Sequence, residues 1–258
     1  MEKVFIKNRH NLSIVVVINK HYNSKGLAFV MHGLGGFKEQ PHIQLIANTF
    51  QEAGLTTILF DTTNSIGESD GKYEDATMEN YYEDLEDVIS WSKSQPWYQE
   101  PFILAGHSLG GYSVIRFAEK YPEKVKGVFA WAPVVSGELS YKATKQSNEL
   151  IEWQKSGWKI RTSNSKPGLE LRLPWSHMTE RLSHNLLPGA DKLTMPIAIL
   201  VGDQDTSCPP THQQILFDTI PPKEKQLHIV KDARHNFNDK KHLEKLKTIL
   251  RKWIQKLK

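Results

Sequence analysis

Ten residues, Pro101-Phe-Ile-Leu-Ala-Gly-His-Ser-Leu-Gly110, carry the strongest signal in this chain. The apolar run Pro101–Ala105 leads directly into Gly106-His-Ser108-Leu-Gly110, a G-x-S-x-G pattern, and helical apolar spacing follows in Gly110–Lys120. A serine on such a sharp strand-to-helix turn is held in a strained conformation, and only small neighbours let the turn close. The pattern therefore predicts that Ser108 stands clear of a sheet edge as a nucleophile.

A second G-x-S-x-G match occurs at Gly67-Glu-Ser69-Asp-Gly71. Its surroundings differ, because loop-like residues precede it in Thr62–Ile66 and follow it as well. A strand–turn–helix context is what the chemistry requires. We therefore expect Ser69 to belong to a turn that closes the loop after Thr56–Phe60, and Ser108 to be the nucleophile.

Outward from Ser108, β-branched apolar runs alternate with amphipathic segments along most of the chain. This alternation predicts an α/β fold, with a mostly parallel eight-stranded sheet and helices on both faces. The first two runs have no helix between them, which predicts an antiparallel lead-in. The expected strands are Val4–Lys7, Ser13–Asn19, Gly26–His32, Thr56–Phe60, Pro101–Ala105, Val125–Trp131, Pro196–Val201 and Gln226–Val230. The expected helices are Pro41–Ala53, Met78–Lys93, Gly110–Lys120, Thr211–Ile220 and Asp239–Lys258.

The alternation breaks between Val135 and Ala190, a length of about 55 residues. Because a structureless loop of this length is improbable in a compact domain, we expect residues 135–190 to be an inserted cap of one or two helices with irregular turns. Residues 1–134 and 191–258 would then form the core, although an edge decoration away from the site is the alternative. We expect the aromatic residues of this cap to cover an apolar cavity, and the candidates for substrate binding are Tyr141, Trp153, Trp158 and Trp175.

Composition excludes several classes of protein. With 258 residues, 39% hydrophobic and 24% charged, the chain resembles neither a disordered segment nor a disulfide scaffold. No apolar run approaches the roughly 20 residues of a membrane span, and the N-terminus lacks a signal-peptide core. We therefore expect a cytoplasmic protein without integral membrane association. The single cysteine, Cys208, excludes an internal disulfide and is expected to be a small buried side chain.

Net positive charge is confined to one segment. The chain is +4 overall, whereas Asp239–Lys258 alone is +6, so the remainder is −2. Apolar residues recur there at helical spacing, which favours a helix packed on the core with a solvated lysine face over a membrane-surface or polyanion patch. No nucleic-acid motif accompanies it. The acidic run Asp84, Glu86 and Asp87 is likewise expected to be a solvated helix face.

A serine hydroxyl needs a base, and the base needs an orienting acid. Among 11 histidines, His235 is the best placed, because it follows the last core strand by a short loop at the carboxyl edge of a parallel sheet. Two acids follow the preceding strand, Asp203 and Asp205. Asp203 is close enough to the strand end to cap the turn, whereas Asp205 reaches further into the loop and is favoured.

Acyl transfer also needs donors for the oxyanion. The glycine-rich loop Met31-His-Gly-Leu-Gly-Gly36 follows a predicted strand, and we expect the amides of Leu34 and Leu109 to be these donors. A phosphate-binding loop is disfavoured, because neither G-x-G-x-x-G nor a P-loop is present. His32 and His107 are expected to brace the loop and the turn. No metal-binding motif is present, so no metal or cofactor is expected.

The combination of His32-Gly33-Leu34-Gly35, Gly106–Gly110 and Gly202-x-x-Asp205 followed by His235 resembles the α/β-hydrolase superfamily over essentially the whole chain. Within it, the chain is similar to short-cap esterases of the serine aminopeptidase, monoacylglycerol lipase and feruloyl esterase group. That group usually has Arg/Asn-Gly-His-Gly where this chain reads Asn64-Ser-Ile-Gly67, with one residue more, so a different turn is expected there. The resemblance implies Asp205 as the acid, a cap after the sixth strand, and ester hydrolysis without a cofactor.

Together these observations predict a serine carboxylesterase acting on small to medium hydrophobic or aromatic esters through an acyl-enzyme. A lipase, thioesterase, acyltransferase or peptidase with the same triad is the alternative. A peptidase would need an acid for the substrate amine, and the cap offers Glu138, Glu149, Glu152 and Glu170. A non-catalytic binding module is the alternative from another class. The expected partner is a small-molecule ester.

Overall fold

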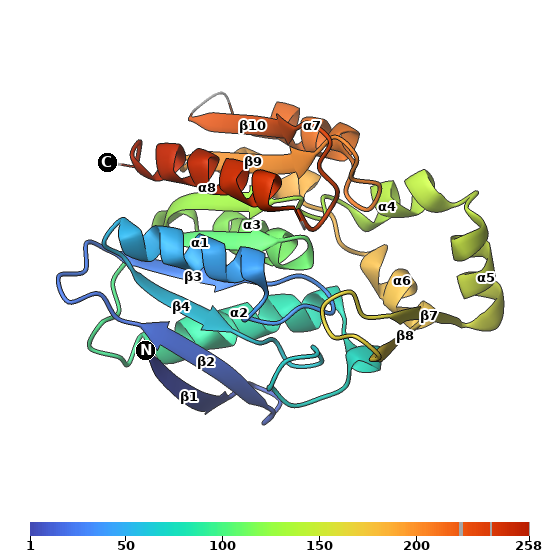
Figure 1. Ribbon diagram of the computed structural model, residues 1–258, viewed down its shortest axis with the longest axis horizontal. Coiled ribbons are helices and arrows are strands. Elements are labelled where there is room, and N and C mark those ends of the chain that lie inside the picture. Colours follow the sequence, from blue (N-terminus) through green and yellow to red (C-terminus); the bar gives the residue numbers. More distant parts are fainter. Residues whose placement is uncertain (222–223, 238, 258) are drawn as a thin grey trace.

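The computed structural model describes residues 1–221, 224–237 and 239–257. In this part of the chain, eight strands form one sheet in the order β1-β2-β4-β3-β5-β6-β9-β10 (Figure 1). Strand β2 pairs antiparallel with both β1 and β4, and the other pairs are parallel, which confirms the predicted lead-in and the mostly parallel sheet. The strands are β1 Glu2–Lys7, β2 Ser13–Asn19, β3 Leu27–Met31, β4 Thr56–Phe60, β5 Phe102–His107, β6 Val125–Trp131, β9 Ile197–Gly202 and β10 Lys225–Val230.

Helices cover both faces of the sheet. Helices α1 and α8 lie together in front of it in Figure 1, and α2 and α3 lie behind it. The long helices are α1 Pro41–Glu52, α2 Met78–Ser92, α3 Leu109–Lys120, α7 Pro210–Thr219 and α8 Lys240–Ile254, and short 3-10 turns are η1 Tyr73–Asp75, η2 Pro122–Lys124 and η3 Leu187–Lys192. These helices lie close to their predicted bounds, although Lys258, the expected end of the last helix, lies outside the described residues.

Helix α8 packs on the core with its apolar stripe. Leu246, Leu250 and Trp253 are buried, and the Trp253 ring packs at a tilt against Phe129 of β6. On its polar side, Lys247 and Arg251 pair with the single carboxylate of Glu52 on α1. The charged segment is therefore attached to the fold by burial of its apolar face, as the apolar spacing predicts.

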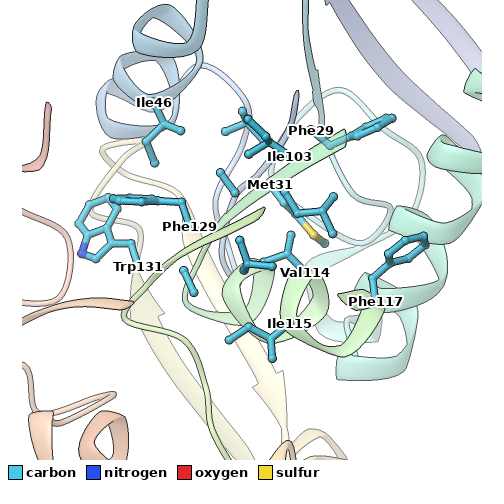
Figure 2. Packing of buried hydrophobic residues seen from close by; sticks show 14 of the residues in the cluster. Phe29, Met31, Ile46, Ile103, Val114, Ile115, Phe117, Phe129 and Trp131 are labelled. Atoms are coloured by element: carbon cyan, nitrogen blue, oxygen red, sulfur yellow. The ribbon is translucent and has the colours of Figure 1, made fainter. Parts of the chain in front are cut away.

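The central strands β3 and β5 are buried along their whole length, because helices cover them on both sides. Figure 2 shows Met31 and Ile103 from these strands, Phe129 from β6, and Val114 and Phe117 from α3 in one contiguous cluster. This packing fixes the carboxyl ends of neighbouring strands at one edge of the sheet. The loops that leave this edge carry the candidate site.

Between β6 and β9 the chain leaves the sheet, and Figure 1 shows this insertion beside the edge of the core. Its elements are α4 Gly137–Thr144, α5 Asn148–Ser156, β7 Trp158–Thr162, β8 Glu170–Pro174 and α6 Trp175–Arg181. The expectation of one or two helices with irregular turns is wrong, because three helices and an antiparallel pair of strands form. The strands were missed since each is short and only the alternation of buried Leu171 and Leu173 with exposed Arg172 marks β8.

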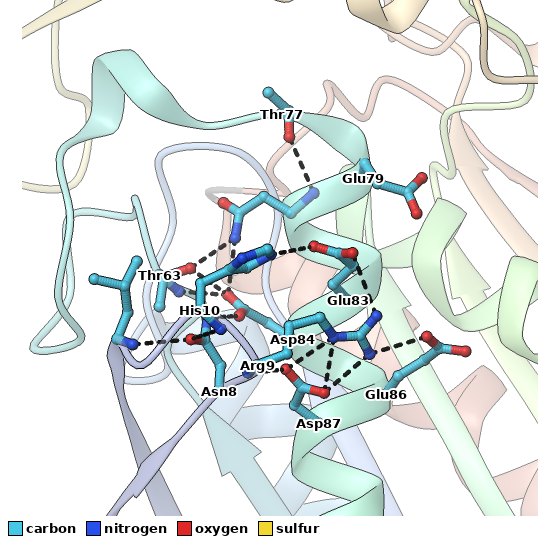
Figure 3. A network of polar contacts seen from close by, with 12 residues as sticks. Asn8, Arg9, His10, Thr63, Thr77, Glu79, Glu83, Asp84, Glu86 and Asp87 are labelled. Atoms are coloured by element: carbon cyan, nitrogen blue, oxygen red, sulfur yellow. Dashed lines mark hydrogen bonds and ion pairs between the residues drawn. The ribbon is translucent and has the colours of Figure 1, made fainter.

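The predicted solvated face on α2 is also wrong (Figure 3). Asp84 is fully buried and accepts hydrogen bonds from Asn8 Nδ2 at 2.9 Å and from the backbone and hydroxyl of Thr63 at 2.6 and 2.7 Å. Asp87 and Glu86 bind the guanidinium of Arg9. The acidic run instead attaches the hairpin between β1 and β2 to the loop after β4, because these distant segments bring it donors that helical spacing alone does not reveal.

Candidate active site

Ser108 lies on a strained turn between β5 and α3. Its φ and ψ are 55° and −113°, and its backbone N–H donates to the Trp131 carbonyl at 2.9 Å. The turn closes only with glycine on both sides. A Cβ on Gly106 would lie 2.3 Å from the Gly110 carbonyl oxygen, and one on Gly110 would lie 2.4 Å from that of His32. The glycines of the motif therefore permit the contact that holds Ser108 at the sheet edge.

The other serine motif forms a closed loop. Ser69 Oγ donates to the Asp61 carbonyl at 2.6 Å and accepts the Val15 N–H at 2.8 Å. The hydroxyl is therefore engaged both as a hydrogen-bond donor and as an acceptor. Asn64, at the start of the preceding turn, has φ 59° and its N–H donates to the Asp70 carbonyl. This serine thus closes the loop after β4, as expected from its surroundings.

His235 and Asp205 meet at the carboxyl edge of the sheet. His235 Nδ1 donates to Asp205 Oδ2 at 2.7 Å. Asp205 is buried, and its Oδ1 accepts the N–H groups of Ser207 and Cys208 at 2.9 and 2.8 Å. Asp203, the other sequence candidate, is exposed, so its carboxylate stays in solvent. Because a carboxylate only accepts, His235 carries its proton on Nδ1 and leaves Nε2 free to accept one.

Ser108 and His235 line one cavity of about 850 Å³. Among the described residues, no hydrogen bond joins the Ser108 hydroxyl to the His235 ring. His107, beside Ser108, packs its ring 4.7 Å from that of His235 and donates from Nε2 to the His235 carbonyl at 3.2 Å. Burial lowers the pKa of His107 well below its usual value, so it braces the two loops as a neutral side chain.

The loop after β3 runs directly past Ser108. A Cβ on Gly33 would lie 2.9 Å from Ser108 Cβ, so only a glycine allows this approach. His32 holds the loop by donating from Nδ1 to the Gly33 carbonyl at 2.8 Å and accepting the Thr62 N–H at 3.1 Å. In the described part of the chain, the backbone N–H groups of Leu34 and Leu109 donate to no protein acceptor. These two amides are available to a ligand in the cavity, which both residues line.

Of the four aromatics expected over the cavity, Trp153 lines it. Tyr141, Trp158 and Trp175 are not among its lining residues. Trp158 is 38% exposed and is covered by Arg172 with 4.8 Å between guanidinium and ring, and Trp175 packs edge-on against Trp153 with ring centroids 5.4 Å apart. Which side chains of the insertion line the cavity depends on how its helices and strands are oriented, and spacing along the sequence does not reveal this.

Cys208 lies next to the Asp205 loop and is 2% exposed. Burial, together with the Asp205 charge, raises the pKa of its thiol to about 12, while Arg181 and the Ser108 side chain act in the opposite direction. It is therefore a buried, protonated side chain, as expected.

Among the polar cavity residues that sequence reasoning missed are Arg161, His177 and Arg181. No motif marks them, because all three come from the insertion. Across the described ranges, no group of three or more His, Cys, Asp or Glu side chains could hold a metal ion. None of the described helices is both long enough and apolar enough to cross a bilayer.

The sequence of this chain is similar to those of known hydrolases. A family model described as serine aminopeptidase, S33, matches residues 22–185 and 168–241. The mitochondrial palmitoyl-protein thioesterase ABHD10 of Mus musculus is 26% identical over 205 residues, which cover 79% of this chain and 67% of that protein.

Two solved structures are similar over nearly their whole length. Est1E from Butyrivibrio proteoclasticus with ferulic acid bound has a TM-score of 0.82 at 20% identity, covering 98% of each chain. Alpha/beta hydrolase domain-containing protein 10 from mouse has a TM-score of 0.79 at 23% identity, covering 100% of each. The fold is therefore the α/β-hydrolase fold.

Proposed function

This chain belongs to the serine aminopeptidase, S33, family of α/β-hydrolases, and we propose that it is a serine hydrolase that cleaves carboxylic esters with Ser108, His235 and Asp205 as its catalytic triad. The observation that carries the proposal is the 2.7 Å hydrogen bond between His235 and Asp205, beside the strained turn of Ser108 in one cavity. The family supports hydrolysis; the bond cleaved and the roles of these residues are the proposal.

In the acylation step, Ser108 Oγ attacks the ester carbonyl while His235 Nε2 takes its proton. Asp205 holds the imidazole in the required tautomer and stabilises the imidazolium that forms. Negative charge develops on the carbonyl oxygen, and the amides of Leu34 and Leu109 stabilise it. His235 then returns the proton to the leaving alcohol, and the acyl group remains on Ser108.

Deacylation repeats these steps with water as the nucleophile. His235 removes a proton from the water, the second tetrahedral intermediate uses the same two amides, and Ser108 leaves with its proton restored. The insertion, residues 135–190, acts as a cap over the acyl-enzyme. Its buried apolar group of Leu150, Trp153, Leu171 and Leu173 supports acceptance of hydrophobic or aromatic substituents.

A thioesterase is the second candidate. It is supported by the similarity to a palmitoyl-protein thioesterase, and the same triad can cleave an ester or a thioester. A peptidase has less support, because of the four cap acids considered for binding a substrate amine, Glu149 alone lines the cavity. Its carboxylate already pairs with Lys159 at 2.8 Å.

The test is hydrolysis of p-nitrophenyl esters of increasing acyl length, with acyl thioesters and aminoacyl amides in parallel. Ser108→Ala is expected to lose activity by several orders of magnitude, and a fluorophosphonate should label wild type but not this variant. Ser69→Ala is the matched control and should retain activity. Wild-type turnover no faster than that of Ser108→Ala would refute the proposal. It would favour the alternative, a non-catalytic binding module on the same scaffold.

A further inference from the structure

The candidate cavity carries an excess of positive charge. Four cationic side chains line it, Lys159, Arg161, Arg181 and Arg234, against one carboxylate, Glu149. Lys159 pairs with Glu149, and within the described ranges none of the three arginines has a carboxylate within 4 Å. The chain outside its C-terminal helical segment has a net charge of −2, so the excess is a property of this cavity.

Arg181, the last residue of α6, is the most enclosed of the three arginines. Its Nη2 donates to Ser140 Oγ at 3.1 Å, and its Nε is buried without a hydrogen-bond partner in the described structure. Burial lowers the pKa of the guanidinium, yet this group keeps its proton in proteins. Arg181 is partly buried and forms no ion pair among the described residues, which is unfavourable for the folded protein, and a bound anion would relieve this cost.

Nearby carboxylates are already engaged elsewhere. Glu180 precedes Arg181, but it binds His184 and accepts the N–H groups of Met78 and Glu79 at the start of α2. Asp205 is occupied by His235 and by two backbone amides. Among the described residues, neither Glu180 nor Asp205 forms an ion pair with Arg181.

The position of Arg181 relates it to the reacting centre. Arg181, Cys208 and Ser108 all line the same cavity, so the guanidinium and the candidate nucleophile share one space. One turn before Arg181, His177 also lines the cavity and donates from Nδ1 to the Ala76 carbonyl at 2.8 Å. Burial lowers the pKa of His177 to about 4, so Arg181 supplies the positive charge on this helix.

We propose that Arg181 binds a carboxylate of the substrate, so that the preferred substrate is an ester bearing a second, ionised carboxyl group. The inference rests on the proposed esterase function and names its substrate class. Arg181 lines the cavity, and its planar guanidinium carries several N–H donors that match the two oxygens of a carboxylate. Arg161 adds positive potential beside the Leu34 loop, because its Nη2 would lie 3.3 Å from a Cβ placed on Gly35.

The test uses matched ester pairs that differ in one charge. On the acyl side, p-nitrophenyl hemiglutarate is compared with its methyl ester; on the alcohol side, 3-acetoxybenzoate is compared with its methyl ester. In wild type, kcat/KM should favour one anionic member by about 10- to 100-fold, the range expected for a charge-assisted bidentate pair. Arg181→Met should remove most of this ratio, Arg181→Lys should keep part of it, and Arg172→Met, on the exposed face of the insertion, should leave it unchanged.

Equal kcat/KM for both members of each pair in wild type, or an unchanged ratio in Arg181→Met, would overturn the inference. Competitive inhibition of the neutral ester by glutarate but not by dimethyl glutarate gives a wild-type test that survives misfolding of the variant. If wild type hydrolyses none of these esters, the proposed function fails. In that case, calorimetry can still test the anion site. Glutarate binding to wild type that is lost in a folded Arg181→Met protein would support the site, whereas absence of glutarate binding to wild type would refute it.

Discussion

His235 Nδ1 lies 2.7 Å from Asp205 Oδ2, while Oδ1 of the same carboxylate accepts two backbone N–H groups. The backbone of the loop after β9 thus holds the carboxylate in place, and the carboxylate in turn holds the imidazole. Since Asp205 is buried and held by two backbone donors, it fixes both the orientation and the tautomer of the ring. The Nε2 atom of His235 is left as the only acceptor on that side chain.

We expect Asp205→Asn to lower kcat by about 10⁴-fold, the loss measured for the equivalent change in another serine hydrolase. The amide would donate where the carboxylate accepts and would favour the wrong tautomer of His235. Asp203→Asn, at an exposed neighbour, should change kcat little. Steady-state kinetics on a p-nitrophenyl ester checks this, and similar kcat values for the two variants would contradict the assigned role of Asp205.

We expect Asn8→Ala to reduce the free energy of unfolding by about 1–3 kcal/mol, because it leaves the buried Asp84 carboxylate without one of its donors. Asn8 also accepts the N–H groups of His10 and Leu12 through its amide oxygen. Lys7→Ala, at an exposed neighbour, should cost less than about 0.5 kcal/mol. Urea unfolding compares the two variants, and equal losses would show that the contact with Asp84 contributes little.

A pH-dependent stability is expected from Glu119 on α3. Burial raises the pKa of this carboxyl from 4.5 to about 7, against the opposing effect of Arg116. Between these pH values the folded protein keeps a proton that the unfolded chain releases, so stability falls as the pH rises from about 4.5 to 7. Glu119→Gln removes the ionisable group. The free energy of unfolding of this variant, relative to that of wild type, should therefore increase by up to about 3 kcal/mol between pH 5 and pH 8.

Urea unfolding at pH 5 and pH 8 measures this difference. Glu123→Gln, at an exposed position on the same side of the molecule, is the control and should show no such change. If the stability difference between Glu119→Gln and wild type is the same at both pH values, then the Glu119 carboxyl titrates normally in the folded protein.

The local sequence determined the backbone of this protein to a large extent. Runs of apolar residues predicted the strands of the main sheet, because strands such as β3 and β5, which are buried on both faces, must be apolar along their length. The glycines around Ser108 predicted the turn, because no larger residue fits beside the Gly110 and His32 carbonyls. The spacing of Asp205 and His235 after successive strands predicted their meeting at one sheet edge.

Only the tertiary structure decided which polar side chains are buried and what they contact. Helical spacing alone could not show that Asp84 is covered by Asn8 and Thr63, nor that Trp158 faces away from the cavity while Arg181 lines it. These outcomes depend on how segments far apart in the sequence are placed against one another. The cost of desolvating a charge is set by that placement, whereas backbone conformation and apolar burial are encoded locally.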